Sequence, residues 1–520
     1  MADRSPQALG RRRFLGLAAG GAAAVGFSAA GCSPSVGGSS SSSSANVLRI
    51  ATSDGNTNDS YDPLRLERAM QILTACLMYE SLVDFDDRMQ PVGRLAESFR
   101  TEDDGTTWTF TLRDGVTFHD GKPLTPADVI YSITRALDPN EGSGNSLAGQ
   151  LKGILRAGGM TAPDARTVKF SLDTKYVFFP GAMATRFARI YRAGTTSFDE
   201  PVGTGPFAFA SFKAGQSFEA KRFAGYWGEA PAIEQVSVIN YPNESTRLSA
   251  LIDGDVDLMF EVAAAAAADI TGADGLRILE QKSATWIPLA LDTTVAPFDD
   301  PKVVKAMKLA IDRKKVVEVG LGGYGTVGYD TPIPADDASF AGLPEPARDL
   351  ARARSLLASA GHAKGLTLPR LTCLDQASAT SMALVIQQQL AEIGVKFEIA
   401  RESAATYWDD SWLKKPFYSN DYQRRTPDEI LKLAFTSDGA WNMSKQSDPQ
   451  LDAAVAAAAS TTDVREQKRQ YAVAQRLIAQ RNSTIVSAQL SRLSGISDRV
   501  RGVTTNPVFW LDLRKASVSS

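Results

Sequence analysis

Residues 405–442 hold the side chains best suited to bind a solute, because aromatic rings and charged groups are concentrated there. A concave site for a flexible molecule needs apolar walls and a few well-placed polar groups. The aromatic residues of this segment are Tyr407, Trp408, Trp412, Phe417, Tyr418, Tyr422 and Trp441. Arg425 has the planar, forked donor geometry that suits a carboxylate. The alternative is that most of these rings pack inside the protein, and that Arg424 and Arg425 pair with Asp428 or Glu429.

Constellations that could perform catalysis are scarce along the rest of the chain. The only two histidines, His119 and His362, have no His or Cys partner at metal-ligand spacing. The G-x-S-x-G pattern of a nucleophile turn does not occur. Residues 323–328 fit G-x-G-x-x-G, but they follow a helical pattern and precede Pro332, so we expect a loop. We therefore predict no enzyme activity, no metal site and no cofactor.

The periodicity of apolar residues mixes strands with helices and predicts an α/β fold. Strand patterns occur at 47–51, 108–113, 168–172, 217–221, 236–239 and 396–399. Helical patterns start at Pro63 and at Thr125-Pro126, where Thr is the expected N-cap, and cover 301–319 and 380–393. Asp114-Gly115 is typical of a hairpin turn, which predicts that 108–113 pairs with 116–118.

The first 46 residues predict export and attachment to a membrane. A twin-arginine signal is expected from Arg11, Arg12, Arg13, Phe14 and Leu15. Small residues at 29–31 before Cys32 resemble the processing box of a bacterial lipoprotein, in which the Cys becomes the N-terminus and carries diacylglycerol. We predict a signal peptide at 1–31, a Ser/Gly-rich tether at 32–46, and a lipid-anchored body on the extracytoplasmic side of the cell membrane. The alternative is a cleaved leader with an incidental Cys.

Composition excludes several classes of protein. A chain of 520 residues exceeds one compact core, so two or more lobes are expected. Its net charge of −3 argues against nucleic-acid binding, which needs a basic surface. Beyond residue 46 no apolar stretch reaches membrane-spanning length. Cys76 and Cys373 lie far apart in the sequence, and we expect two free thiols instead of a disulfide.

Motifs spread over about 47–515 resemble the extracytoplasmic solute-binding proteins of the oligopeptide/dipeptide ABC-importer family (bacterial solute-binding protein family 5). They are WTFTLRDGVTFHDGKPLTPADVIYSI (108–133), GTGPFAF (203–209), GYWG (225–228), APFDDPKVVKAMKLAIDRKKVV (296–317) and WNMSKQSDPQLDAA (441–454). The resemblance implies a monomeric receptor that captures a peptide or peptide-like solute and delivers it to the subunits of an ABC permease.

The resemblance also suggests which residues contact the solute. Many peptide receptors of the family carry Asp-Tyr-x-Asp-Pro, whose first Asp pairs with the amino group of the peptide, and Asp421-Tyr422 matches its start. The sequence then departs from this motif and is closer to a branch with Arg-Pro-Thr-x-Asp and a later Trp-Asn. The predicted ligand-binding residues are Tyr407, Trp408, Asp421, Tyr422, Arg425, Trp441 and Asn442. An opine-like or other non-peptide carboxylate is the alternative solute.

The implied fold is α/β and bilobed, like the periplasmic binding proteins, and closes like a hinged trap. The expected parts are lobe I at 47–282 with an inserted subdomain near 86–195, lobe II at 283–492, and a C-terminal return to lobe I at 493–520. Crossing strands near 286–292 and 485–489 would form the hinge. Two alternatives from other classes are an extracellular hydrolase and a sensor or chaperone lipoprotein built on the same fold.

Overall fold

The computed structural model describes residues 46–519, apart from 54, 57–58, 67, 103–104, 142–144 and 506–510. The predicted export signal (Arg11, Arg12, Arg13, Phe14 and Leu15), Cys32 and all of the tether except Asn46 lie outside the described residues. Within the described part, no helix is long and apolar enough to cross a membrane.

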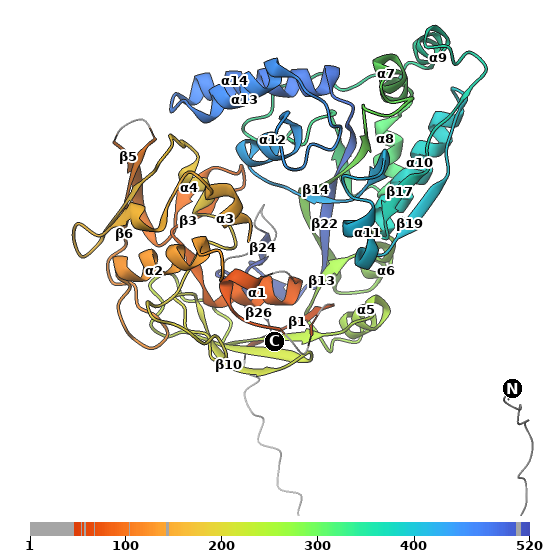
Figure 1. The fold of residues 1–520 in the computed structure, drawn as a ribbon. Coiled ribbons are helices and arrows are strands. Elements are labelled where there is room, and N and C mark those ends of the chain that lie inside the picture. The colour runs from red at the N-terminus through yellow and green to blue at the C-terminus, as the bar shows by residue number, and fades with distance from the viewer. Residues whose placement is uncertain are drawn as a thin grey trace, which may run out of the picture. The chain divides into compact units, whose positions relative to one another are not determined.

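A large mixed sheet runs through both lobes (Figure 1). In spatial order its strands are β10 (Phe207–Lys213), β11 (Ser217–Arg222), β12 (Gln235–Asn240), β1 (Val47–Thr52), β13 (Leu258–Val262), β22 (Ile485–Ser497), β14 (Leu276–Leu291), β20 (Phe417–Ser419), β17 (Leu371–Leu374) and β19 (Ile399–Glu402). In lobe I, β1 is parallel to β12 and β13. In lobe II, β17 is parallel to β19 and β20. The mixed α/β fold predicted from the sequence is confirmed.

The two long strands β14 and β22 connect the lobes. They pair antiparallel from Leu276↔Ser497 to Leu289↔Ile485. The strands predicted near 286–292 and 485–489 pair with each other, since Trp286 lies opposite Gln489, and their role as the hinge stays a prediction. The proposed lobe boundaries at 282/283 and 492/493 fall inside these strands, so the chain passes between lobes without a break in β structure.

The loop predicted at 323–328 is wrong in part, because Gly325–Val327 forms strand β15 on β22. The glycines here permit close contact between backbones. A Cβ on Gly325 would lie 2.6 Å from the carbonyl oxygen of Gln489, and one on Gly328 would lie 2.3 Å from that of Val486. The G-x-G-x-x-G spacing therefore reflects strand pairing.

The subdomain contains a four-stranded antiparallel sheet in the order β5 (Ala96–Thr101), β6 (Thr107–Leu112), β8 (Thr167–Ser171) and β7 (Met160–Thr161). Its helices are α2 (Pro126–Leu137), α3 (Ser146–Leu151), η2 (Ala157–Gly159) and α4 (Phe179–Ala182). Two short strands flank it in sequence, β2 (Glu80–Ser81) and β9 (Arg189–Ile190), and these pair with each other. A further hairpin joins β3 (Val83–Phe85) to β4 (Pro91–Gly93).

The predicted hairpin between 108–113 and 116–118 is wrong. Strand β6 pairs with β5 on one side and with β8 on the other, so no edge is left for 116–118. That segment instead folds back on itself, with Thr117 bridging Pro123 and the Phe118 N–H donating to the Lys122 carbonyl at 2.8 Å. The predicted start of α2 is confirmed, since the Thr125 N–H donates to Asp128 Oδ2 at 2.8 Å.

The turn at 203–207 is fixed by His119. The ring Nε2 lies 3.0 Å from the Gly205 carbonyl, and the Gly203 N–H donates to Nδ1 at 3.2 Å. A Cβ on Gly203 would lie 1.9 Å from the Met78 carbonyl oxygen, so only glycine fits. Burial lowers the pKa of His119, consistent with a neutral imidazole that fastens the turn.

The other elements of lobe I flank its half of the sheet or close the C-terminus. The helices are η1 (Pro63–Arg65), α1 (Ala69–Met78), α5 (Glu244–Ile252), η3 (Ala264–Ala266) and α6 (Ala267–Gly272). The C-terminal return forms β23 (Val500–Arg501) with β26 (Ser517–Val518), and β24 (Thr504–Thr505) with β25 (Leu511–Asp512). One buried apolar cluster joins the lobe I sheet to the subdomain, with Ile50, Phe110 and Phe207 fully buried in it.

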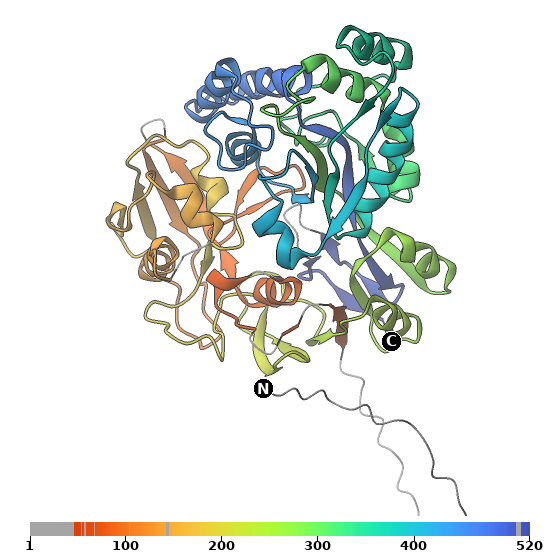
Figure 2. The ribbon, with the colours of Figure 1, turned by 45° about the vertical axis from the view of Figure 1, so that its right-hand side comes forward.

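Lobe II surrounds its half of the sheet with helices. They are α7 (Pro301–Ala310), α8 (Arg313–Lys315), η4 (Val316–Gly320), α9 (Leu350–Ser359), α10 (Ala377–Ala391), α11 (Ala404–Asp410), α12 (Pro427–Phe435), α13 (Pro449–Ala459) and α14 (Val464–Arg481). The short strands are β16 (Leu366–Thr367), β18 (Val395–Lys396) and β21 (Tyr422–Gln423). In Figures 1 and 2, α13 and α14 (blue) lie side by side at the rim of this lobe. Cys76 and Cys373 are both free thiols, as predicted.

Candidate functional site

Strand ends from both lobes meet at one cavity. Strand β13 of lobe I ends at Val262 and β17 of lobe II ends at Leu374, each beside a parallel neighbour. In open α/β sheets, ligands bind at the carboxyl ends of such strands. A cavity of about 500 Å³ lies there, lined by 261–265, Thr285, 319–322, Tyr324, 376–378, Ser381, Asp421 and 490–493. We call it the hinge-side cavity; its volume suits a small ligand.

The charged residues that line the hinge-side cavity are two carboxylates and one guanidinium. Arg492 Nε lies 3.6 Å from Glu261 Oε1, and Asp421 Oδ1 accepts a hydrogen bond of 2.8 Å from Gln376 Nε2. Burial lowers the pKa of Arg492 to about 10, against the charges of Glu261 and Asp421, which raise it. The surplus of negative charge makes this cavity suited to an ammonium group.

The segment 421–425 starts at the hinge-side cavity and contains the short strand β21 (Tyr422–Gln423). Asp421, Gln423 and Arg425 are half-buried, whereas Tyr422 and Arg424 between them are buried. Strand β21 pairs with β14, and the ring of Tyr422 stacks on Trp286 at 4.9 Å. The alternation of burial indicates that Asp421, Gln423 and Arg425 share one face, and an extended segment of this length would place its ends about 13 Å apart.

Arg425 lines two adjoining cavities of about 70 and 430 Å³, which we call the subdomain-side cavities. They share Ser146 and Gln150 of the subdomain with Arg425 and Glu429 of lobe II. Arg425 Nη1 pairs with Glu429, and its Cζ lies 5.0 Å from the ring centroid of Trp441. Its buried Nε has no hydrogen-bond partner among the described residues. The pairing with Glu429 thus uses Nη1 and leaves the Nε–H without an acceptor.

The subdomain and lobe II touch beside these cavities. The Tyr176 hydroxyl donates to Asp428 Oδ2 at 2.7 Å and accepts from Gln150 Nε2 at 2.9 Å. Desolvation raises the pKa of Asp428 to about 7, although Tyr176 and Lys432 act in the opposite direction. The ring of Phe178 lies 5.7 Å from that of Tyr471 in α14. A buried polar contact and an aromatic contact therefore hold the subdomain against lobe II.

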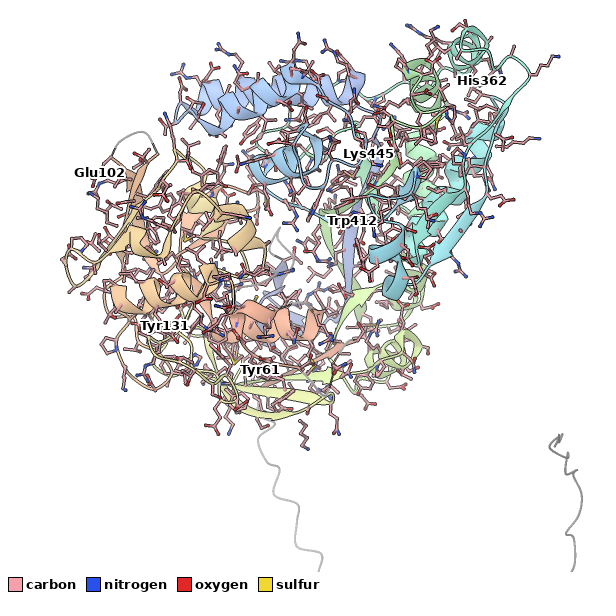
Figure 3. The ribbon with its side chains drawn as sticks, viewed as in Figure 1. Tyr61, Glu102, Tyr131, His362, Trp412 and Lys445 are labelled. Carbon is pink, nitrogen blue, oxygen red and sulfur yellow. The ribbon has the colours of Figure 1, made fainter. Side chains whose placement is uncertain are left out.

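Other residues predicted to bind the ligand make hydrogen bonds within lobe II. Tyr407 is fully buried, and its hydroxyl donates to Asn420 Oδ1 at 3.2 Å. Tyr422 accepts from Trp412 Nε1 at 2.7 Å, and burial raises its pKa to about 12. Asn442 Nδ2 donates to the Gln446 carbonyl at 2.9 Å. These hydrogen bonds join side chains of lobe II to one another and to its backbone. Trp412 is labelled in Figure 3.

The structure thus divides the predicted set. It brings Asp421, Arg425 and Trp441 to cavity walls, while Trp408 is 41% exposed at α11, with its ring 5.6 Å from Trp412. Sequence reasoning missed Gln423, Gln376, Arg492 and Gln150. The alternation of 421–425 could have indicated Gln423, but the other three come from distant elements and carry no motif.

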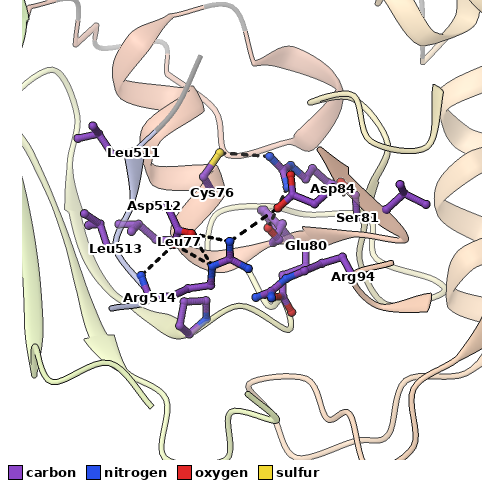
Figure 4. A pocket seen from close by; sticks show the side chains of 14 residues that line it. Cys76, Leu77, Glu80, Ser81, Asp84, Arg94, Leu511, Asp512, Leu513 and Arg514 are labelled. Atoms are coloured by element: carbon purple, nitrogen blue, oxygen red, sulfur yellow. Dashed lines mark hydrogen bonds and ion pairs between the residues drawn. The ribbon is translucent and has the colours of Figure 1, made fainter. Parts of the chain in front are cut away.

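A further cavity in lobe I is bounded by paired charges (Figure 4). Arg94 pairs with Glu80, and Arg514 pairs with Asp512 and, at 3.9 Å, with Asp84. The Arg189 guanidinium lies 3.2 Å from Cys76 Sγ. Among the described residues, no group of three or more His, Cys, Asp or Glu side chains could hold a metal ion. The candidate site comprises the cavities that Asp421 and Arg425 line.

Comparison with known proteins identifies relatives and proteins of similar fold. The chain is 28% identical to the glutathione-binding protein GsiB of Pectobacterium atrosepticum over 445 residues, 81% of this chain and 84% of that protein. Its fold matches HbpA2 from Haemophilus parasuis with a TM-score of 0.79 at 24% identity, covering 91% and 100% of the two chains. It also matches DppA from Helicobacter pylori in complex with the peptide STSA, with a TM-score of 0.73 at 22% identity, covering 91% and 98%.

The family model for the middle region of the bacterial extracellular solute-binding proteins, family 5, matches residues 90–444. That range includes the subdomain, β14, β17 and the whole 421–442 segment. On this match, the chain belongs to the family 5 bacterial extracellular solute-binding proteins.

Proposed function

We propose that this protein is the receptor of an ABC importer and that it captures a short peptide or a peptide-like solute between its lobes. Membership of the solute-binding family supports the binding role. Among its relatives, one is named for glutathione, which is a tripeptide, and one fold neighbour was solved with the peptide STSA. These names describe the other proteins, and they favour a peptide here.

The observation that carries the proposal is the opposite polarity of the two ends of 421–425. Asp421 lies in a cavity with surplus negative charge, which suits the amino group of a peptide. Arg425 offers its Nε edge at the other end, which suits the terminal carboxylate. A separation of about 13 Å corresponds to three to four extended residues. A zwitterionic peptide of that length would satisfy both ends at once.

Calorimetry with tri- and tetrapeptides tests this assignment. N-acetylation removes the amino charge and should weaken binding through Asp421, whereas C-amidation removes the carboxylate and should weaken binding through Arg425. In Asp421→Asn the difference between free and acetylated peptides should vanish, while the difference between free and amidated peptides remains. Equal binding of all these peptides by the wild type would contradict the proposal.

We also propose that the solute closes the lobes around itself, since β14 and β22 pass from one lobe to the other beside the cavity. Small-angle scattering should show a smaller radius of gyration with peptide than without it. Binding should also raise the melting temperature through linkage, since a ligand at 100 times Kd adds about 2.7 kcal/mol to stability. A bound peptide without compaction would contradict the hinged mechanism.

Export and anchoring form a separate part of the proposal. Arg11, Arg12 and Arg13 would direct twin-arginine export, and Cys32 would carry the lipid that keeps the receptor beside its permease. Replacing the three arginines with Lys should leave precursor in the cytoplasm, because twin-arginine export does not accept a merely cationic leader. Cys32→Ala should release the body from the membrane. Normal export of the Lys variant would contradict the first assignment.

A further inference from the structure

The orientation of the Gln150 amide in α3 is set by its neighbours. The Tyr176 hydroxyl has one hydrogen, which it donates to Asp428 Oδ2. Its oxygen therefore accepts from Gln150 Nε2. This leaves Gln150 Oε1 as a buried acceptor with no hydrogen-bond partner among the described residues.

A buried donor of the opposite kind lies on the same walls. Arg425 Nε has no hydrogen-bond partner among the described residues, and both side chains line both subdomain-side cavities. Buried polar groups are normally satisfied, and leaving one unsatisfied is unfavourable. The unsatisfied acceptor and the unsatisfied donor belong to side chains that line the same two cavities, and together they would complement a ligand that carries an N–H close to an anionic oxygen.

We propose that Gln150 is a specificity-determining residue, whose Oε1 accepts the last peptide N–H of a solute with its carboxylate on Arg425. This inference rests on the proposed function. The C-terminal residue of any peptide presents both groups, since its N–H and its carboxylate are attached to the same Cα. The larger cavity has apolar walls from Ile154, Leu433 and Trp441 that suit the side chain of that residue.

The proposal gives the subdomain a direct part in recognition. Arg425 alone accepts any carboxylate, whereas Gln150 adds a requirement for a neighbouring N–H. The receptor should therefore prefer a peptide to an ester of the same shape, in which an oxygen atom replaces the last N–H. Trialanine and its ester analogue Ala-Ala-lactate form the matched pair.

Calorimetry with these two ligands against three proteins tests the proposal. The wild type should bind trialanine about 3- to 10-fold more tightly than the ester, the range expected for one hydrogen bond. Gln150→Leu should lose that preference. The control is Gln446→Leu, because Gln446 also has a buried, partnerless Oε1 but lines a cavity elsewhere in lobe II, so the preference should persist.

The outcomes separate the two proposals. Equal affinity of the wild type for amide and ester, or an unchanged preference in Gln150→Leu, overturns the role of Gln150 and leaves the peptide receptor standing. Absence of binding by either ligand and by longer peptides overturns the proposed function itself. Melting curves check that each variant folds, and Gln150→Met replaces Gln150→Leu if the latter does not.

Discussion

The hinge-side cavity and the subdomain-side cavities differ in the kinds of residue that line them. The first is lined by strand ends and by small residues, including Ala263, Gly320 and Ser378, so the backbone defines its shape. The two subdomain-side cavities are lined by long side chains, including Gln150, Arg425 and Lys432, whose rotamers define the space. We infer that the hinge-side cavity has a rigid shape and recognises the charged amino end of the solute. The subdomain-side cavities can change shape to fit the side chain at the other end of the solute.

The largest loss of peptide affinity is expected at the subdomain-side cavities, from substitution of Arg425. Arg425→Ala should weaken peptide binding by about 2–5 kcal/mol, because it leaves a buried carboxylate without its partner. Arg425→Lys should also lose affinity, since an ammonium cannot reproduce the forked contact. Calorimetry with trialanine measures both. Arg401→Ala, which removes an exposed arginine paired with Asp375, is the control and should bind normally.

The fixed end should respond next most strongly. Asp421→Asn should weaken binding of peptides with a free amino group by about 1–3 kcal/mol, because a charge-assisted hydrogen bond becomes a neutral one. Acetylated peptides should bind both proteins alike. Asp375→Asn changes an exposed carboxylate nearby and should leave binding unchanged. If Asp421→Asn also binds normally, the amino group lies elsewhere.

The contact between the subdomain and lobe II predicts a pH dependence of stability. Burial raises the pKa of Asp428 from its ordinary value of 3.8 to about 7 in the folded protein. The folded form then holds a proton that the unfolded chain has released, so the free energy of unfolding falls as pH rises from about 4 to 7. The slope from this group should reach at most about 1.4 kcal/mol per pH unit.

Urea unfolding at several pH values measures this slope. Asp428→Asn should flatten it, because the amide does not titrate but can still accept from Tyr176. Asp421→Asn, at the other end of the site, should keep the wild-type slope. A wild-type slope that survives in Asp428→Asn would assign the proton to another group.

The smallest loss of peptide affinity is expected for Gln423, which lies between Asp421 and Arg425. Gln423 is half-buried on the face shared by Asp421 and Arg425, so Gln423→Ala should cost about 0.5–1.5 kcal/mol of binding, the net value of one hydrogen bond. The loss should appear with tripeptides and not with single amino acids. An equal loss for both would indicate that the solute does not run along 421–425.

Local signals predicted local structure well. The N-cap at Thr125 and the strands at 47–51 and 168–172 are encoded within a few neighbouring residues, and each is observed. The hairpin at 108–118 failed because β5 and β8 compete for both edges of β6, and a turn motif contains no information about such competitors.

The helical pattern at 301–319 shows the same limit. It breaks at Ile311 because Asp312 caps α8 and its backbone N–H donates to Gln389, which lies 77 residues later in the chain. The residues of the candidate site show the same difference between local and tertiary information. Asp421 and Arg425 follow from a motif and from side-chain chemistry, whereas Gln150 and Arg492 reach the cavities through tertiary contacts that no spacing reveals.

The pairing of β2 with β9 has a consequence for how such receptors can diversify. Ser81 lies opposite Arg189, so the chain leaves for the subdomain and returns from it at neighbouring positions. A module with adjacent ends can be lengthened, shortened or exchanged without moving the sheet that carries it. Exchange of the subdomain between family members would then change the preference for the carboxylate end of the solute. Recognition of the amino end would be unchanged, because it depends on the strands that join the lobes.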